Sequence, residues 1–289
     1  MKKYLKLMRI HHWIKNLLIF APLFLNGTIF HSSRSLYTLV GFLSFCFVSS
    51  AIYIINDIND IEQDRLHSTK RKRPIASGEI SAKKARILLI PLIATGISIN
   101  AFVGQTSVVA GIGILLVYIL LNIFYSNGMK NIPLLDVIIL ASGYFLRILY
   151  GSVISSVQVS AWLYLFVITG SLYLGFGKRK SELAIESDGT RHVLKGYTKE
   201  FLDKNMYSCM TLSLAFYSIW CLEKGDSRNL MVNYYLWSVP LVIVIWLKYS
   251  LIVEGSNDGD PVRVFCGDKV LMVLAVSYAI MMTVLIYMN

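Results

Sequence analysis

Nine apolar stretches, each long enough to cross a bilayer, follow one another along the 289 residues of the chain. A helix needs about 20 apolar residues to span roughly 30 Å of hydrocarbon. Because no water is available there to satisfy backbone polar groups, the stretches predict α-helices. We therefore predict an all-α fold, a polytopic membrane helical bundle in which residues 1–289 form one domain. The predicted spans are 14–30, 36–56, 83–101, 106–125, 136–156, 160–177, 205–222, 233–252 and 270–288.

Composition supports a membrane protein, since 55% of residues are hydrophobic and only 16% are charged. The first span follows Lys2, Lys3, Lys6 and Arg9, as a signal peptide would. It lacks a small-residue cleavage site, so we interpret it as a retained span. The four cysteines have neither disulfide-framework nor zinc-site spacing.

The net charge of +11 is explained by membrane topology rather than by nucleic-acid binding. With a cytoplasmic N-terminus and alternating spans, all but four of the 28 Lys and Arg face the cytoplasm. Arg34, Lys224 and Arg228 lie in outer loops, and Arg147 lies within a span. This asymmetry obeys the positive-inside rule. It predicts a multi-pass protein of the inner (plasma) membrane.

An acidic motif, NDINDIEQD (residues 56–64), follows the second span. On a helix, Asp57, Asp60 and Asp64 share one face because their spacing is i, i+3, i+7. Stacked carboxylates repel one another unless a cation lies between them, and Mg²⁺ prefers such oxygen ligands and bridges to phosphates. The alternative is a solvated helix end whose acids pair with the lysines and arginines that follow.

The following segment, HSTKRKRP, places several cations beside these acids. Cations next to a metal-binding acid cluster suit a polyphosphate. His67 lies nearest to the site, and its alternative interpretation is an ordinary surface group. The predicted substrate-binding cations here are Lys70, Arg71 and Arg73.

NDINDIEQD followed by RPIASGEIS resembles the first signature of the UbiA superfamily of membrane prenyltransferases. The resemblance implies a UbiA-like bundle whose Asp-rich loops bind a diphosphate through Mg²⁺, with Asn56 in the site. It also implies a second acidic motif after the sixth span, facing the same cavity. GFGKRKSELAIESD (residues 175–188) lies there and offers Glu182 and Glu186 in place of the usual aspartates.

GKRKSEL, HHWIKN and YSNGMKNIPLLDVIILASGYFLRILYG resemble one branch of the superfamily, the decaprenyl-phosphate phosphoribosyltransferases. This resemblance implies transfer of 5-phosphoribose from phosphoribosyl pyrophosphate (PRPP) to a polyprenyl phosphate. We expect Asp57, Asp60 and Asp64 to be catalytic and to hold Mg²⁺, with Glu182 as a fourth metal ligand. Lys178, Arg179 and Glu182 are expected to bind substrate. The expected partners are both substrates and the lipid bilayer, and a homo-oligomer is compatible with the sequence.

Further substrate-binding candidates border the spans. Lys15 and Asn16 begin the first span, where a lysine also reaches the interface for structural reasons. Tyr125 and Lys130, in YSNGMK, resemble the family's tyrosine-to-lysine motif. Arg147 lies inside a span, where a guanidinium indicates either function or a buried structural partner.

Two other functions fit parts of the sequence. An aromatic prenyltransferase, which moves a polyprenyl group to a quinone or haem precursor, would be expected to carry a second aspartate-rich motif. A transporter or lipid-binding scaffold would be expected to place polar residues at mid-membrane. Most of the charge in this chain lies instead at one membrane face.

Overall fold

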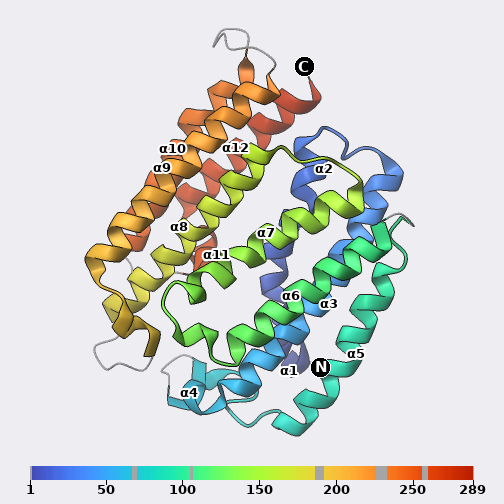
Figure 1. Cartoon of the computed structure of the whole chain (residues 1–289), viewed down its shortest axis with the longest axis vertical. Helices are drawn as coiled ribbons and strands as arrows, with labels where there is room; N and C mark the ends of the chain where they lie inside the picture. Colours follow the sequence, from blue (N-terminus) through green and yellow to red (C-terminus); the bar gives the residue numbers. More distant parts are fainter. Residues whose placement is uncertain are drawn as a thin grey trace. The chain divides into compact units, whose positions relative to one another are not determined.

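The computed structural model describes residues 2–66, 70–104, 107–185, 192–225, 233–255 and 260–288. Every regular element within these ranges is a helix, as predicted (Figure 1). The chain clusters into two compact units. Unit 1 comprises residues 1–24, 28–130 and 146–158, and unit 2 comprises residues 25–27, 131–145 and 159–289. The prediction of one domain over the whole chain stays a prediction.

Unit 1 is built around α3 (Ser32–Asn59), which packs along α5 (Ala82–Asn100). Ser44 on α3 donates a hydrogen bond to the Gly96 carbonyl oxygen on α5 over 2.6 Å. A Cβ atom at Gly96 would lie 2.7 Å from Val48, so glycine permits this close approach. The elements of unit 1 are α1 (Lys2–Leu7), η1 (Ile10–Phe20), most of α2 (Ala21–Leu25), α3 (Ser32–Asn59), α4 (Ile61–Leu66), η2 (Lys70–Lys72), α5 (Ala82–Asn100), α6 (Val108–Ser126), most of η4 (Met129–Asn131) and the C-terminal part of α7 (Leu135–Ser155).

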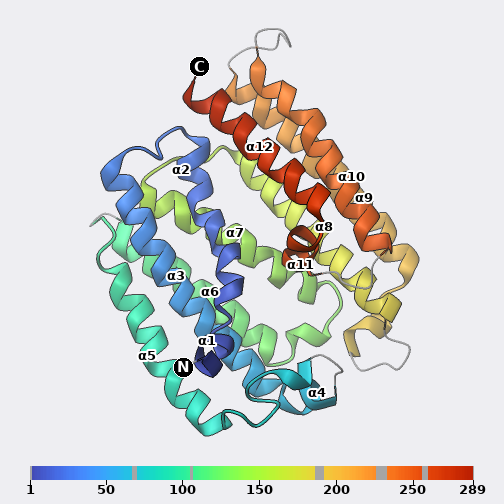
Figure 2. The same ribbon diagram turned by 180° about the vertical axis from the view of Figure 1, so that it is seen from behind.

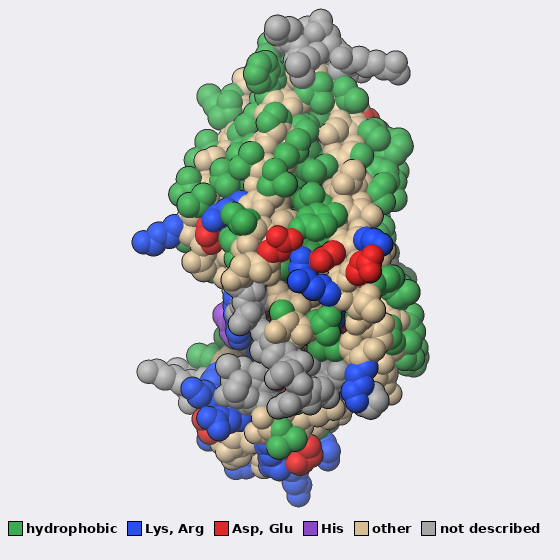
Figure 3. Space-filling view, turned by 90° about the vertical axis from the view of Figure 1, so that its left-hand side faces the viewer, with side chains coloured by type: hydrophobic (Ala, Val, Ile, Leu, Met, Phe, Trp, Pro, Cys, Tyr) green, Lys and Arg blue, Asp and Glu red, His purple; other side chains and the backbone are tan. Residues whose placement is uncertain are grey.

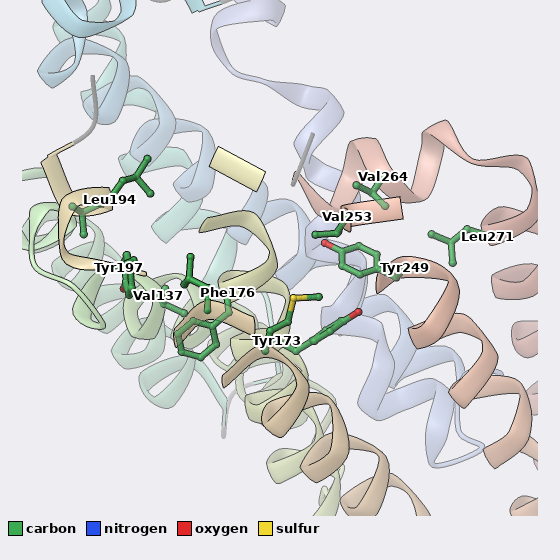
Figure 4. Close-up of a cluster of buried hydrophobic side chains, with 12 residues drawn as sticks. Val137, Tyr173, Phe176, Leu194, Tyr197, Tyr249, Val253, Val264 and Leu271 are labelled. Carbon is green, nitrogen blue, oxygen red and sulfur yellow. The ribbon is translucent and has the colours of Figure 1, made fainter. Parts of the chain in front are cut away.

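Unit 2 holds α8 (Ala161–Ile185) and α9 (Lys199–Lys224) side by side (Figures 1 and 2). Helices α10 (Ser238–Gly255) and α12 (Lys269–Tyr287) also pack together. Its core includes Tyr173 and Phe176 of α8 together with Tyr249 of α10 (Figure 4). The elements of unit 2 are the N-terminal part of α7, α8 (Ala161–Ile185), η5 (His192–Gly196), α9 (Lys199–Lys224), η6 (Tyr234–Trp237), α10 (Ser238–Gly255), α11 (Pro261–Gly267) and α12 (Lys269–Tyr287).

Side-chain oxygens define where several helices begin, because the first backbone N–H groups of a helix have no partner within it. Ser81 caps α5, and Thr198 caps α9. Asp260 accepts from the Val262 N–H at the start of α11, and Asp268 accepts from the Leu271 N–H at the start of α12.

Five of the described helical segments are long and apolar enough to cross a membrane, and a shorter apolar one covers Ile10–Leu25. The five are Ser32–Asn59, Val108–Ser126, Leu135–Ser155, Tyr234–Gly255 and Lys269–Tyr287. The predicted spans 83–101, 160–177 and 205–222 form the helices α5, α8 and α9. These three helices are not among the five that are long and apolar enough to cross a membrane. Figure 3 shows a broad apolar area on one face and a band of acidic and basic side chains next to it.

Candidate functional site

The acidic motif lies at a helix break in unit 1. Helix α3 ends at Asn59, Asp60 is its C-cap residue, and α4 begins at Ile61. The expected single helical face for Asp57, Asp60 and Asp64 is therefore interrupted at its middle residue. Asparagine and aspartate favour such breaks because their side chains compete with the helical hydrogen bonds of the backbone.

Asp57 and Asp64 converge on one arginine. Nη1 of Arg73 lies 3.1 Å from Oδ1 of Asp57 and 2.6 Å from Oδ2 of Asp64. Arg9 forms an ion pair with the same Oδ1 atom of Asp57. Both carboxylates are buried, so the arginines compensate charge that water cannot reach. The alternative to metal binding was that the acids pair with basic residues that follow them in the sequence. Asp57 and Asp64 do so, since both pair with Arg73.

Asp60 has different surroundings, since it pairs with Lys130 of η4 and is partly exposed. Asn56, one helical turn before it, accepts a hydrogen bond from Ser126 at the end of α6. The structure thus brings Lys130 and the acidic motif together. Tyr125 lies beside Ser126 on α6.

Arg9 was not among the predicted site residues. Its backbone has φ +50°, which places it in the left-handed region between α1 and η1. The guanidinium carbon also lies 5.1 Å from the centre of the Tyr53 ring, within the range of a cation–π interaction. The sequence separates Arg9 from Asp57 by 48 positions, so no local spacing indicated this contact.

The segment after the motif is basic and mostly exposed. Lys70 is partly exposed and Arg71 is exposed, both on η2. The Lys72 carbonyl oxygen accepts a 2.8 Å hydrogen bond from Nζ of Lys6, which ties η2 to α1. His67 lies outside the described residues.

Asn16 and Arg147 meet in the interior of unit 1. Nε of Arg147 donates to Oδ1 of Asn16 over 2.8 Å, and its guanidinium carbon lies 5.0 Å from the centre of the Phe45 ring. Asn16 in turn donates to Ser49 over 3.2 Å. These contacts agree with a structural partner for Arg147 and leave its predicted substrate role untested. Lys15, next to Asn16, is partly exposed.

The predicted second motif lies in unit 2, at the end of α8. Arg179 is fully buried, and its Nε lies 2.7 Å from Oδ2 of Asp136 on α7. It also pairs with Glu182, which is partly exposed. Lys178, the preceding residue, is partly exposed as well. Glu186 lies outside the described residues.

Tyr197, which the sequence did not single out, completes this group. Its hydroxyl donates to Oδ1 of Asp136 over 2.6 Å and accepts from the Leu134 N–H over 2.6 Å. Burial, followed by the hydrogen bond to the Asp136 carboxylate, raises the pKa of the Tyr197 hydroxyl. The hydroxyl therefore stays protonated and acts as a donor at neutral pH.

Carboxylate and amide oxygens in the acidic motif are the chemistry that Mg²⁺ prefers. Within the described ranges, however, no three His, Cys, Asp or Glu residues are arranged to hold a metal ion. Asp57 and Asp64 are paired with arginines, and Asp60 with a lysine. The oxygen atoms of the motif are therefore of the type that Mg²⁺ binds. Lys130 would compete with the ion for the partly exposed carboxylate of Asp60.

Comparison with known proteins agrees on one family. A sequence model of the UbiA prenyltransferase family matches residues 17–275. The decaprenyl-phosphate phosphoribosyltransferase of Corynebacterium glutamicum is 33% identical, over 98% of this chain and 86% of its own length. The Mycolicibacterium smegmatis protein of the same name is 31% identical, over 95% of this chain and 89% of its own length. A UbiA homolog from Archaeoglobus fulgidus, solved bound to GPP and Mg²⁺, has the same fold, with a TM-score of 0.71 and 21% identity over 97% of this chain and 99% of its own.

Proposed function

Because the chain belongs to the UbiA prenyltransferase family, and is therefore an integral membrane transferase, we propose that it transfers 5-phosphoribose from PRPP to a polyprenyl phosphate and releases pyrophosphate. The observation that carries this proposal is the 33% identity to a decaprenyl-phosphate phosphoribosyltransferase over almost the whole of both chains. An aromatic prenyltransferase is the second candidate, favoured by the fold neighbour that binds GPP and Mg²⁺.

The chemistry requires stabilisation of negative charge rather than proton abstraction. The attacking group, a lipid phosphate, is already an anion, so no general base is needed. Bound Mg²⁺ would offset charge on the departing pyrophosphate. Asp60 and Asn56 are partly exposed residues near the break after α3, and Lys130 pairs with Asp60. Arg71 and Lys70 would bind the phosphate groups of the substrates that the ion leaves exposed.

Attack opposite the leaving group inverts configuration at the anomeric carbon of ribose. A product that retains the configuration of PRPP would argue against direct displacement. Lys178, Arg179 and Glu182 remain predicted substrate contacts, with Glu182 also a predicted metal ligand, on the basis of the family resemblance alone.

We further propose nine membrane crossings in the inner membrane, with the acidic motif at the cytoplasmic face. The asymmetric distribution of lysine and arginine supports this orientation. The polyprenyl tail would then reach the site sideways from the bilayer, since its acceptor phosphate lies at the membrane surface.

Two parallel incubations of the purified protein with Mg²⁺ separate the candidates. One contains labelled PRPP and polyprenyl phosphate, and the other contains labelled prenyl diphosphate and hydroxybenzoate. We expect a phosphoribosyl lipid, identified by mass spectrometry, only in the first. Product in the second mixture alone would refute the proposal in favour of the aromatic prenyltransferase.

Asp60→Asn tests the metal site within the same assay. We expect turnover to fall by about a hundredfold or more, because an essential charge on the metal side of the site is lost. Glu62→Gln is the matched control, since Glu62 is an exposed acid of the same motif. Equal turnover by the two variants would show that Asp60 is not an essential metal ligand, whereas no product from the wild type either would indicate a scaffold or transport role.

A further inference from the structure

Unit 1 carries an exposed group of cations outside the acidic motif. Residues 2–9 and 70–90 contain eleven Lys and Arg but only one acid, Glu79. Within the part of the chain that the structure describes, the cations at the start of α5 form no ion pair with an acid. Arg71 is set apart here because it is already a proposed substrate contact. The other exposed cations of these two segments form what we call the basic surface, namely Lys3, Lys6, Lys72, Lys83, Lys84 and Arg86.

The segments that carry the basic surface pack on one hydrophobic cluster. Leu7 at the end of α1 is fully buried in this cluster, which also contains Ile80 and Ala85, at the start of α5. Nζ of Lys6 donates a 2.8 Å hydrogen bond to the carbonyl oxygen of Lys72. In agreement with these contacts, α1 and the start of α5 lie at the same end of unit 1 (Figures 1 and 2). The cations therefore belong to one packed region of the fold.

One face of α5 changes from charged to apolar within two turns. Lys83, Ile87 and Ile90 share this face because their spacing is i, i+4, i+7. Ile87 and Ile90 are 63% and 74% exposed, and exposed isoleucines on a helix of a membrane protein indicate contact with lipid. Lys83 and Ile90 are about 10 Å apart along the helix, whereas the headgroup layer on each side of a bilayer is about 5–8 Å thick. An α5 with Ile90 in the hydrocarbon therefore has Lys83 among the lipid headgroups.

Helix α1 has the composition of a short helix at the membrane interface. Its Leu7 is buried, whereas Tyr4 and Leu5 are 37% and 45% exposed and lie between two exposed lysines. Tyrosine is enriched at the level of the headgroups, and a lysine there extends its amine toward the polar layer while its methylene groups cover apolar surface. Nζ of Lys3 lies 5.7 Å from the centre of the Tyr4 ring, so the amine and the ring are next to each other.

From these observations we propose that the basic surface is a docking surface for the headgroups of anionic bilayer lipids. The charge is complementary to lipid phosphates, and the exposed apolar residues beside it on α1 and α5 are suited to the acyl chains of the same lipids. A Lys or Arg near an anionic membrane surface strengthens binding by about fivefold. This inference rests on the membrane crossing by α5 in the proposed topology, and it is independent of the transferase reaction.

The first test measures the membrane depth of α5 by electron paramagnetic resonance. Nitroxide labels are attached to Lys83→Cys and to Ile90→Cys in a Cys266→Ser background, because Cys266 is the exposed one of the four cysteines. The full-length protein is placed in nanodiscs of phosphatidylcholine and phosphatidylglycerol. We expect the label at position 90 to be reached mainly by oxygen, and the label at position 83 mainly by a water-soluble nickel chelate. If the nickel chelate reaches both labels equally, α5 does not enter the bilayer there, and the inference is overturned.

The second test measures lipid binding by native mass spectrometry of the full-length protein in a nonionic detergent. Lys83→Gln/Lys84→Gln and Lys3→Gln/Lys6→Gln should each lower the affinity for phosphatidylglycerol by about threefold to tenfold, and leave that for phosphatidylcholine unchanged.

Lys199→Gln/Lys204→Gln is the matched control for the lipid measurement. It removes the same charge from exposed positions on α9, where Lys204 pairs with Glu200, and it should change the affinity for phosphatidylglycerol by less than about twofold. An equal loss in this control would mean that net charge alone attracts the lipid, and would overturn the inference. Equal binding of the two lipids by the wild type would overturn it as well.

Two other phosphate ligands are distinguished by the same variants. If Lys83→Gln/Lys84→Gln raises the KM for polyprenyl phosphate but keeps its affinity for phosphatidylglycerol, the surface receives the acceptor and the inference is wrong. It is also wrong if inorganic pyrophosphate displaces the bound phosphatidylglycerol.

Failure of the lipid inference is distinguishable from failure of the other proposals. If phosphatidylglycerol binds as expected but no phosphoribosyl lipid forms, the proposed reaction is wrong and the docking surface stands. If the labels place Ile90 in the bilayer but the charge variants bind phosphatidylglycerol like the wild type, the crossing by α5 stands and the docking surface is refuted.

Discussion

Arg179 of α8 is fully buried, with its Nε 2.7 Å from Oδ2 of Asp136 on α7. Tyr197 donates to the other oxygen of the same carboxylate over 2.6 Å. One carboxylate therefore joins three segments of unit 2, namely α7, α8 and the residue that follows η5. We infer that this contact stabilises the fold of unit 2, in addition to any role in binding.

Asp136→Asn tests this contact. We expect the free energy of unfolding to fall by about 3–5 kcal/mol, because the buried guanidinium of Arg179 loses its buried charged partner and keeps the partly exposed Glu182. Tyr197→Phe should cost less, about 1–3 kcal/mol, since it leaves a buried acceptor without its hydroxyl donor. Thermal unfolding of the purified protein in detergent measures both effects.

Glu200→Gln is the control for these variants, since Glu200 and its partner Lys204 are both largely exposed on α9. Its expected effect is below about 1 kcal/mol. A stability for Asp136→Asn equal to that of Glu200→Gln would mean that the buried pair contributes nothing.

The contact between Asn16 and Arg147 gives a second prediction, in unit 1. Asn16→Ala should destabilise the protein by about 1–3 kcal/mol, because Nε of Arg147 loses a buried acceptor. Asn131→Ala, at an exposed position, should change stability by less than about 0.5 kcal/mol. If Asn16→Ala is as stable as Asn131→Ala but its affinity for substrate falls, the contact between Asn16 and Arg147 acts in binding rather than in packing.

A third prediction concerns close packing at Gly151 of α7. A Cβ atom there would lie 2.1 Å from the carbonyl oxygen of Ile19, and backbone cannot move aside as a flexible side chain can. Gly151→Ala should therefore destabilise the protein by about 1–3 kcal/mol. Gly113→Ala on α6 is the matched control, since nothing lies within 4 Å of its added Cβ. Equal unfolding temperatures for the two variants would rule out the predicted clash.

Helical content could be predicted from the sequence, because apolar stretches of this length in a membrane have few alternatives to helix. The acidic motif could also be located, since its spacing is local. The break at Asp60 was missed because the i, i+3, i+7 rule assumes a continuous helix, whereas α3 ends at Asn59.

Contacts between distant segments could not be predicted in the same way. Arg9 meets Asp57 only because the fold brings the start of the chain to the end of α3. Arg179 lies in a basic run that is typical of an exposed loop, and its burial depends on Asp136 in another helix. In both cases the charge partner decides whether an arginine faces solvent, and local sequence does not reveal that partner.

The start of α12 gives a prediction about pH. Asp268 accepts from the Leu271 N–H over 2.7 Å and pairs with Lys248 over 3.0 Å, and in that order of importance these contacts lower the pKa of its carboxyl group. A lowered pKa in the folded state means that the stabilisation is fully present above the ordinary aspartate pKa of about 3.9 and is lost as the pH falls through the folded value. Asp268→Asn should therefore be less stable than the wild type at pH 7, and the difference should shrink as the pH falls below about 4. Unfolding temperatures measured from pH 7 to pH 3 check this, with Glu62→Gln as the control, and a difference that is constant with pH would show that ionisation of Asp268 does not stabilise the helix.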